Sequence, residues 1–440
     1  MTYLTIYQAS TTFGLTTILN SGLTDRCRTD KKILFLTKNT LHDAHFEIIR
    51  TGFLLEKAQA NFDQIIDFNE LIHPIYPAHL QMKKLDKSTT EIIYQLICKL
   101  LKCDCVSEFY CESIQASPSL YLAHIFHNSN IHIYSDGLMV YSPTRINIPT
   151  GIAERIKTVN YRPFIRNCKP FLLIEAMPEY IELSANNPTP RTTNETDTKK
   201  YAPILFLGQC FSLHGICSET EELYIYKKAI EDIARLTNNS RKIIFKPHPS
   251  YPHHNYESVI QILNASVSQL VHIEKSEITA EDAAKALNPY AAVGIFTTSL
   301  FNIYNELSIP VYQTGTDELW KKLEPYSNSN RIPLLAASVI IPPIAHINSS
   351  IAQFSLLIAE GEKRFQRIYL PVAYAMQPSH FEPIIKTGAL NPILKTADLT
   401  HDELLFLPLK KKKEGISLIM NKIYKKFINL KRLRSIPNNT

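Results

Sequence analysis

The sequence predicts an α/β protein with two parallel-sheet units, and three features of the chain support this. Short apolar segments alternate with longer amphipathic segments, which is typical of strand–helix–strand units with right-handed crossovers. The alternation stops in a polar segment at residues 184–200 and then restarts. The length of 440 residues suits two or three domains that each bury a core.

The first unit is expected to span residues 1–183. Its apolar segments predict strands at residues 3–9, 31–38, 62–68 and 130–137. The amphipathic segments between them predict helices at residues 42–59, 89–102 and 117–129.

The second unit is expected to span residues 201–403. It begins with a strand and polar loop at 201–211, followed by an amphipathic helix at 219–238 and a strand with its loop at 240–250. A strand, a hydroxyl-rich turn and a helix follow at 291–307, and a short strand at 309–315. Residues 184–200 are polar and contain two prolines, so they predict a linker or mobile loop. The alternative is a surface insertion within one domain.

The composition indicates a globular protein, with 45% hydrophobic and 20% charged residues. The sequence has no apolar run long enough for a spanning helix, and its N-terminus lacks the pattern of a signal peptide. The eight cysteines include no CxxC pair and no zinc-finger spacing. We therefore expect reduced thiols in a cytoplasmic protein.

Polar residues gather where the predicted strands end. Asp136-Gly137 follows a strand of the first unit, and Gln209 follows the first strand of the second. In open α/β sheets, ligands bind beyond the carboxyl ends of the strands. Taken alone, Asp-Gly is also a common turn, so the assignment depends on the other strand ends.

Two strand ends of the second unit suit a phosphate group. His248 stands between Pro247 and Pro249, which stiffen its loop. The run Thr297-Thr298-Ser299 offers hydroxyls at a helix start, where backbone N–H groups favour anions. The alternatives are a surface histidine in a turn and plain helix capping. If the two units face each other, a carboxylate and an imidazole would flank a bound phosphate ester, which suits transfer from a nucleotide-activated donor.

In their order and spacing over residues 131–307, these motifs resemble bacterial sialyltransferases, and above all the capsular polysialyltransferase family. The resemblance implies a GT-B fold, in which two Rossmann-like domains face across a cleft. It also implies an inverting transfer of sialic acid from CMP-sialic acid, without a metal or other cofactor.

The resemblance further implies roles for single residues. Asp136 is expected to be the general base, and His248 to meet the CMP phosphate and act as a general acid. The remaining donor-side candidates are Gln209, Pro249, Thr297, Thr298 and Ser299.

The motif of the first unit departs from the family pattern at one position. The family has two acids before the glycine and then Tyr, a small residue and Pro, whereas this chain has Ser135-Asp136-Gly137 followed by Tyr141-Ser142-Pro143. Activity is in doubt if the first acid is the base. A hydroxyl is a poor general base, which favours Asp136. Tyr141 and Arg145 are candidate contacts for an anionic acceptor, and a plain surface arginine is the alternative for Arg145.

Residues 404–440 form a basic tail with ten Lys or Arg and one acid, so the rest of the chain carries a net charge of −3. Apolar residues recur at helical spacing, which predicts an amphipathic helix on an anionic membrane. Nucleic-acid binding is disfavoured because the body is slightly acidic and lacks a recognised motif. A solvated helix that packs on its own domain is the second alternative. The apolar positions are Ile416, Ile419, Met420, Ile423, Tyr424, Phe427 and Leu430.

The sequence thus predicts a sialyltransferase that works on the inner face of a bacterial membrane, with an anionic glycan or glycolipid as acceptor. Synthesis of capsule or other surface polysaccharide, in contact with export machinery, is the expected setting. The alternatives are a lipooligosaccharide sialyltransferase, another GT-B enzyme such as a sugar-nucleotide epimerase, and a non-catalytic scaffold of capsule assembly.

Overall fold

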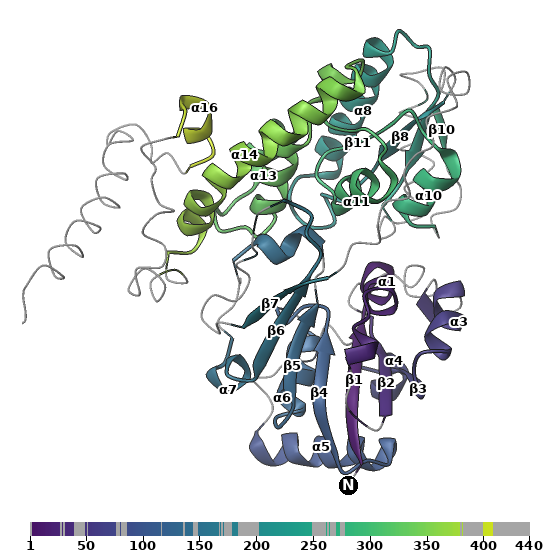
Figure 1. Ribbon diagram of the computed structural model, residues 1–440, viewed down its shortest axis with the longest axis vertical. Coiled ribbons are helices and arrows are strands. Elements are labelled where there is room, and N and C mark those ends of the chain that lie inside the picture. The colour runs from purple at the N-terminus through teal and green to yellow at the C-terminus, as the bar shows by residue number, and fades with distance from the viewer. Residues whose placement is uncertain are drawn as a thin grey trace, which may run out of the picture.

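The computed structural model contains two α/β units, one above the other in Figure 1. The structure describes residues 2–26, 29, 31–38, 49–50, 52–75, 80, 86–115, 117–134, 137–143, 148–166, 168, 170, 178–183, 202–248, 261, 264, 270–272, 278–378, 381 and 399–407. The predicted linker at 184–200 and the tail from residue 408 onward lie outside these residues.

The first unit is built on a seven-stranded parallel sheet in the order β3-β2-β1-β4-β5-β6-β7. This order reverses between β1 and β4, as in doubly wound nucleotide-binding sheets. The strands are β1 (Tyr3–Ala9), β2 (Lys31–Leu36), β3 (Gln64–Asp67), β4 (Cys105–Cys111), β5 (Asn130–Tyr134), β6 (Ile156–Tyr161) and β7 (Glu179–Glu182).

Helices cover this sheet on both faces, as the alternation of side chains along each strand requires. On one face, Tyr7 and Leu34 pack with α1 (Thr12–Asn20) and α3 (Phe53–Gln59). On the other face, Ile6 and Phe35 pack with α5 (Lys87–Leu101) and α6 (Ser119–Ile125). The shorter elements are η1 (Thr24–Arg26), α4 (Phe68–Ile72), η4 (Gly137–Tyr141) and α7 (Thr150–Ala153).

The second unit contains a five-stranded parallel sheet in the order β10-β9-β8-β11-β12. Its strands are β8 (Ile204–Leu207), β9 (Ile243–Lys246), β10 (Leu270–His272), β11 (Ala291–Gly294) and β12 (Val311–Gln313). Its helices are α8 (Glu219–Leu236), α10 (Ala280–Leu287), α11 (Thr298–Leu307), α12 (Thr316–Lys322), α13 (Arg331–Ile340), η7 (Ile344–His346), α14 (Ile351–Met376) and α16 (His401–Leu404). The predicted fold class, α/β with two Rossmann-like units, is confirmed.

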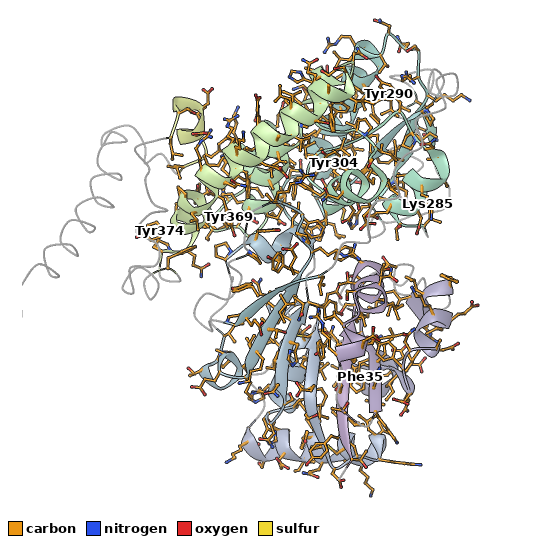
Figure 2. All side chains as sticks on the ribbon, viewed as in Figure 1. Phe35, Lys285, Tyr290, Tyr304, Tyr369 and Tyr374 are labelled. Carbon is orange, nitrogen blue, oxygen red and sulfur yellow. The ribbon has the colours of Figure 1, made fainter. Side chains whose placement is uncertain are left out.

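The sequence analysis missed several elements that complete this fold. Strands β4, β6 and β7 were not predicted, and neither was the antiparallel pair of helices α13 and α14. Helix α14 is 26 residues long and contains Pro371. It runs along the second unit and reaches the first (Figure 1). There Tyr369, labelled in Figure 2, donates a hydrogen bond from its hydroxyl to the backbone oxygen of Tyr141 at 2.6 Å.

The segment at residues 399–407 is fixed on the outside of the second unit. The carboxylate of Glu403 is 1% exposed and accepts a hydrogen bond from Arg367 at 2.6 Å. Phe406 packs edge-on against Trp320, with ring centroids 5.0 Å apart. Phe406 and Leu407, near the start of the predicted tail, therefore pack on the folded unit.

The close packing of α13 on α14 depends on Gly361. A Cβ atom added at Gly361 would lie 2.5 Å from the backbone oxygen of Val339 and 2.7 Å from the Cα atom of Ile340. Backbone atoms of a packed helix cannot move aside as a flexible side chain can, so the two helices must separate to admit a methyl group.

We predict that Gly361→Ala lowers the free energy of unfolding by about 1–3 kcal/mol, the usual cost of overpacking. Urea unfolding followed by circular dichroism measures this change. The control is Gly151→Ala in α7, where an added Cβ meets nothing within 4 Å. This control should be neutral or slightly stabilising. Equal midpoints for the two variants would contradict the role of Gly361.

Candidate functional site

The motifs of the two units meet at the junction between the sheets. Gly137 follows β5 of the first unit, and Thr298 begins α11 of the second. The backbone N–H of Leu138 donates a hydrogen bond to Thr298 Oγ1 at 3.2 Å. A Cβ atom at Gly137 would lie only 2.5 Å from the same oxygen. Segments 160 residues apart in the sequence are thus in direct contact.

Two further contacts hold the units together around this point. Ser142 Oγ donates to the backbone oxygen of Ser329 at 2.6 Å. Arg162 Nη1 pairs with Glu306 Oε1 at 2.7 Å. Burial of Glu306 raises the pKa of its carboxyl, and the charge of Arg162 opposes that rise.

The hydroxyl run at the start of α11 has divided roles. Thr297 is the N-cap, and its Oγ1 accepts from the backbone N–H of Ser299 at 3.3 Å. The hydroxyl of Thr298 accepts from Leu138 across the junction. The capping interpretation therefore holds for Thr297, and Thr298 joins the units. The N-terminus of the ten-residue helix α11 therefore lies at the edge of the sheet where β11 ends.

Gln209 supports the same edge from the neighbouring strand. Its side-chain amide donates to the backbone oxygen of Phe296, and its Oε1 accepts from the backbone N–H of Phe296 at 3.1 Å. Both polar atoms of the amide are thus engaged with the turn between β11 and α11. Gln209, predicted as a nucleotide contact, therefore ties the loop after β8 to this turn.

A buried carboxylate, which the sequence analysis missed, fixes the rest of that loop. Glu222 of α8 is 0% exposed. It accepts hydrogen bonds from the backbone N–H groups of Phe211 at 3.0 Å and Ser212 at 2.8 Å, and from the hydroxyl of Tyr226 at 2.6 Å. Tyr226 also bonds the backbone of Gln209. A buried charge with this many donors makes the loop rigid.

His248 lies beside this loop, at the end of β9. Its Nδ1 atom is 3.3 Å from Cys210 Sγ. Lys246, the last residue of β9, is 3% exposed, and burial lowers the pKa of its ammonium to about 8 against the opposing charge of Glu281. Lys246 Nζ donates to the backbone oxygen of Pro247 at 3.4 Å. Gln209 follows β8, His248 follows β9 and Thr297 follows β11. These three strands are adjacent in the sheet, in the order β9-β8-β11.

The remaining predicted site residues are divided between two groups. Ser135, Asp136, Arg145 and Pro249 lie outside the described residues. Tyr141 is fully buried, and its ring meets that of Tyr369 edge-on with centroids 6.3 Å apart. In this structure the Tyr141 side chain packs the junction and does not offer a surface to an acceptor.

A second buried carboxylate lies at the junction-facing edge of the first sheet. Glu112 follows β4 and is 6% exposed. It accepts from the backbone N–H of Ser10 at 2.8 Å and from the hydroxyl of Thr11, the N-cap of α1. Burial raises the pKa of the Glu112 carboxyl, and these hydrogen bonds oppose the rise. Glu112 was not predicted as a site residue, because the strand that precedes it, β4, was not recognised.

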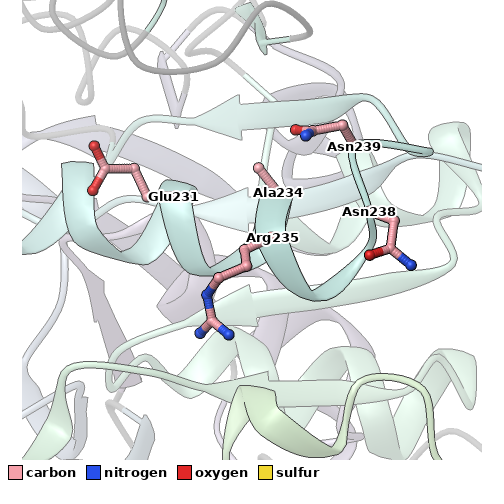
Figure 3. A pocket seen from close by; sticks show the side chains of 5 residues that line it. All are labelled: Glu231, Ala234, Arg235, Asn238 and Asn239. Atoms are coloured by element: carbon pink, nitrogen blue, oxygen red, sulfur yellow. The ribbon is translucent and has the colours of Figure 1, made fainter.

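Other features of the surface do not coincide with this site. A hollow of about 530 Å³ lies at the C-terminal end of α8, lined by Glu231, Ala234, Arg235, Asn238 and Asn239 (Figure 3). Tyr226, which bonds the backbone of Gln209, lies ten residues before the last residue of α8, so this end is about 15 Å further along the helix. Within the described residues, no group of three or more His, Cys, Asp or Glu side chains is placed to hold a metal ion. No helix in the described part of the chain combines the length and apolarity needed to cross a membrane.

Two Rossmann-like units whose strand ends meet at one junction have the architecture of the GT-B fold. The family model for alpha-2,8-polysialyltransferase (POLYST) matches residues 6–316. The chain belongs to this family, and it is a sialyltransferase. The family resemblance drawn from the motifs is thereby confirmed.

Comparison with solved structures gives distant matches. MurG of Acinetobacter baumannii is 10% identical, with a TM-score of 0.45 over 88% of this chain and 99% of that one. The 2,6-sialyltransferase of Photobacterium sp. JT-ISH-224, solved with CMP and lactose, is 13% identical, with a TM-score of 0.40 over 76% of this chain and 75% of that one. A putative UDP-N-acetylglucosamine 2-epimerase of Listeria monocytogenes is 13% identical, with a TM-score of 0.41 over 87% of this chain and 98% of that one. No curated protein sequence matches the chain.

We predict that Gly137→Ala lowers the rate of sialyl transfer about 100-fold, because displacement of about 1 Å at a reacting centre has effects of this size. Gly137 has a φ of +88°, and an added methyl group would collide with Thr298. Transfer rates and melting temperatures measure the effect.

The control for backbone strain alone is Gly215→Ala, where φ is +65° and an added Cβ meets nothing within 4 Å. It should lose a little stability and keep its rate. The double variant Gly137→Ala/Thr298→Ala should recover part of the lost stability, because the colliding hydroxyl is gone. No recovery would show that the contact with Thr298 is not the cause.

Proposed function

We propose that this sialyltransferase moves sialic acid from CMP-sialic acid to a hydroxyl of a glycan, with inversion at the anomeric carbon and without a metal. The observation that carries the proposal is the contact between Gly137 and Thr298. This contact brings the end of β5, which Asp136 follows in the sequence, to the start of α11. His248 lies on an adjacent strand end of the same unit as Thr298.

The proposed reaction is a single displacement. The carboxylate of Asp136 takes the proton from the acceptor hydroxyl as its oxygen forms a bond to the anomeric carbon of the donor. The bond between that carbon and the phosphate oxygen of CMP breaks, and its electron pair leaves with CMP. His248 donates a hydrogen bond or a proton to the departing phosphate, and the N-terminus of α11 favours the same negative charge.

We further propose that the acceptor is a sialylated, anionic glycan and that the linkage is alpha-2,8, as the name of the family suggests. Growth of a capsule or another surface polysaccharide is the corresponding role. Ser135 in place of the first motif acid fits this scheme, because the base is Asp136. A lipooligosaccharide sialyltransferase uses the same donor and differs only in acceptor.

Incubation with CMP-sialic acid and a panel of sialylated and neutral acceptors, read by mass spectrometry, tests the proposal. Added sialic acid on sialylated acceptors is expected, with activity retained in EDTA. UDP-sugars serve as the control donors. Transfer from a UDP-sugar alone, or a strict need for a divalent metal, would contradict the scheme. Binding of CMP without any turnover would instead favour the scaffold alternative.

We predict that Asp136→Asn lowers kcat by about 100-fold or more, because the amide cannot accept the proton of the acceptor hydroxyl. The KM for CMP-sialic acid should change little, since the carboxylate acts on the acceptor. Steady-state kinetics with a soluble acceptor measure both constants. The matched control is Asp25→Asn in η1, an exposed acid of the same unit. Near-normal kcat for Asp136→Asn would remove Asp136 from the mechanism.

We also propose that the basic tail holds the enzyme on the inner face of the plasma membrane. Removal of residues 408–440 should release the protein from vesicles that contain anionic lipid, as measured by co-sedimentation. Transfer to a soluble acceptor should survive, because the contacts of Glu403 and Phe406 with the second unit remain. Added salt should weaken the binding of the full chain. Unchanged vesicle binding after truncation would contradict this role.

A further inference from the structure

The thiol of Cys210 lies against the imidazole of His248 in a fixed geometry. Cys210 follows β8, and His248 follows β9, the adjacent strand in the sheet. Leu207 and Lys246 are paired in register, so the loops that carry the two side chains leave the sheet side by side. Cys210 Sγ is 3.3 Å from His248 Nδ1, within hydrogen-bond distance for sulfur, and Cys210 is 2% exposed.

The backbone around Cys210 is held on both sides. Gln209 is tied to Phe296 by two hydrogen bonds. Phe211 donates its backbone N–H to Glu222 at 3.0 Å. The backbone on both sides of Cys210 is therefore fixed, and its buried side chain lies against the imidazole.

Cys210 is a neutral thiol at physiological pH. Burial raises the pKa of this thiol to about 12, and the nearby Glu222 carboxylate acts in the same direction. A neutral thiol carries one weak donor and a weak acceptor. It adds no charge that would hold His248 permanently as an imidazolium, as a carboxylate partner does.

The direction of the hydrogen bond between the thiol and Nδ1 determines which nitrogen of His248 carries the proton. In the neutral ring this bond has two possible directions: S–H donates to Nδ1, which places the single ring proton on Nε2, or Nδ1–H donates to the sulfur. In the protonated ring, Nδ1–H donates to the sulfur, and Nε2 again carries a proton. When S–H is the donor, Nε2 is a donor in both charge states of the ring, which suits a group that meets a departing phosphate.

We propose that Cys210 is a positioning residue that holds His248 in the tautomer protonated on Nε2. This inference rests on the proposed role of His248 at the leaving phosphate. Cys210 itself does not touch the donor in this scheme, and it acts only through the imidazole.

The first test is the nitrogen spectrum of the full-length protein labelled with ¹⁵N-histidine, in which His248 is assigned by its loss in His248→Ala. The tautomer protonated on Nε2 is expected in the wild type, and a mixture of tautomers in Cys210→Val. A wild-type spectrum with the proton on Nδ1 overturns the proposal, and this reading requires no Cys210 variant to fold.

The second test is kinetic. Cys210→Val is expected to lower kcat about 10-fold, with the KM for CMP-sialic acid changed less than about twofold. Cys210→Ser keeps a donor and should retain most of kcat. In the His248→Ala background, Cys210→Val should have no further effect, because the imidazole through which it acts is absent. Cys217→Ser, in the same loop, is the matched control and should keep normal rates.

The outcomes separate this inference from the proposed function. Full kcat in Cys210→Val, or an equal loss in the presence and absence of His248, overturns the positioning role. In either case, a reduced kcat in His248→Ala would still support the proposed function. Full kcat in His248→Ala would instead overturn the role of His248, and the inference would fail with it.

Discussion

The architecture depends on a single close contact between two segments that belong to different sheets. Gly137 and the backbone of Leu138 lie against the side chain of Thr298, at a distance that leaves no room for a Cβ atom. Only glycine combines that approach with a φ of +88°. The contact fixes how the strand end of the first unit faces the start of α11, so the chemistry of both units is brought to one junction.

Each unit holds its side of the junction with a buried carboxylate. In the first unit, Glu112 binds the backbone of Ser10 and the N-cap of α1. In the second, Glu222 binds the loop after β8. Both carboxylates lie near the point where the strand order of their sheet reverses, which is where doubly wound sheets bind ligands. The cost of burying each charge is offset by several hydrogen bonds, and the result is a rigid loop at each side.

The sequence indicated the α/β class and the motif-bearing strand ends, because their apolar runs are short and clearly bounded. Strand β4 was missed because its sequence, CVSEFYC, mixes polar residues into the strand. Glu108 within it pairs with His132 of β5 at 2.6 Å, a partner that only the folded sheet provides. The role of Gln209 was likewise hidden, since its bond partner Phe296 is 87 residues away. Helix α14 contains Pro371, which is unusual inside a helix because proline lacks the backbone N–H that the helix uses.

We propose that the donor binds at the junction of the two units, and hydrogen–deuterium exchange with and without CMP tests this most directly. Because Leu138 is bonded to Thr298 across the junction, CMP is expected to slow amide exchange in three segments together: residues 137–142, 245–248 and 296–302. The C-terminal end of α8, residues 231–239, should be unchanged and serves as the internal reference. Protection confined to the second unit, with residues 137–142 unaffected, would contradict a site shared across the junction.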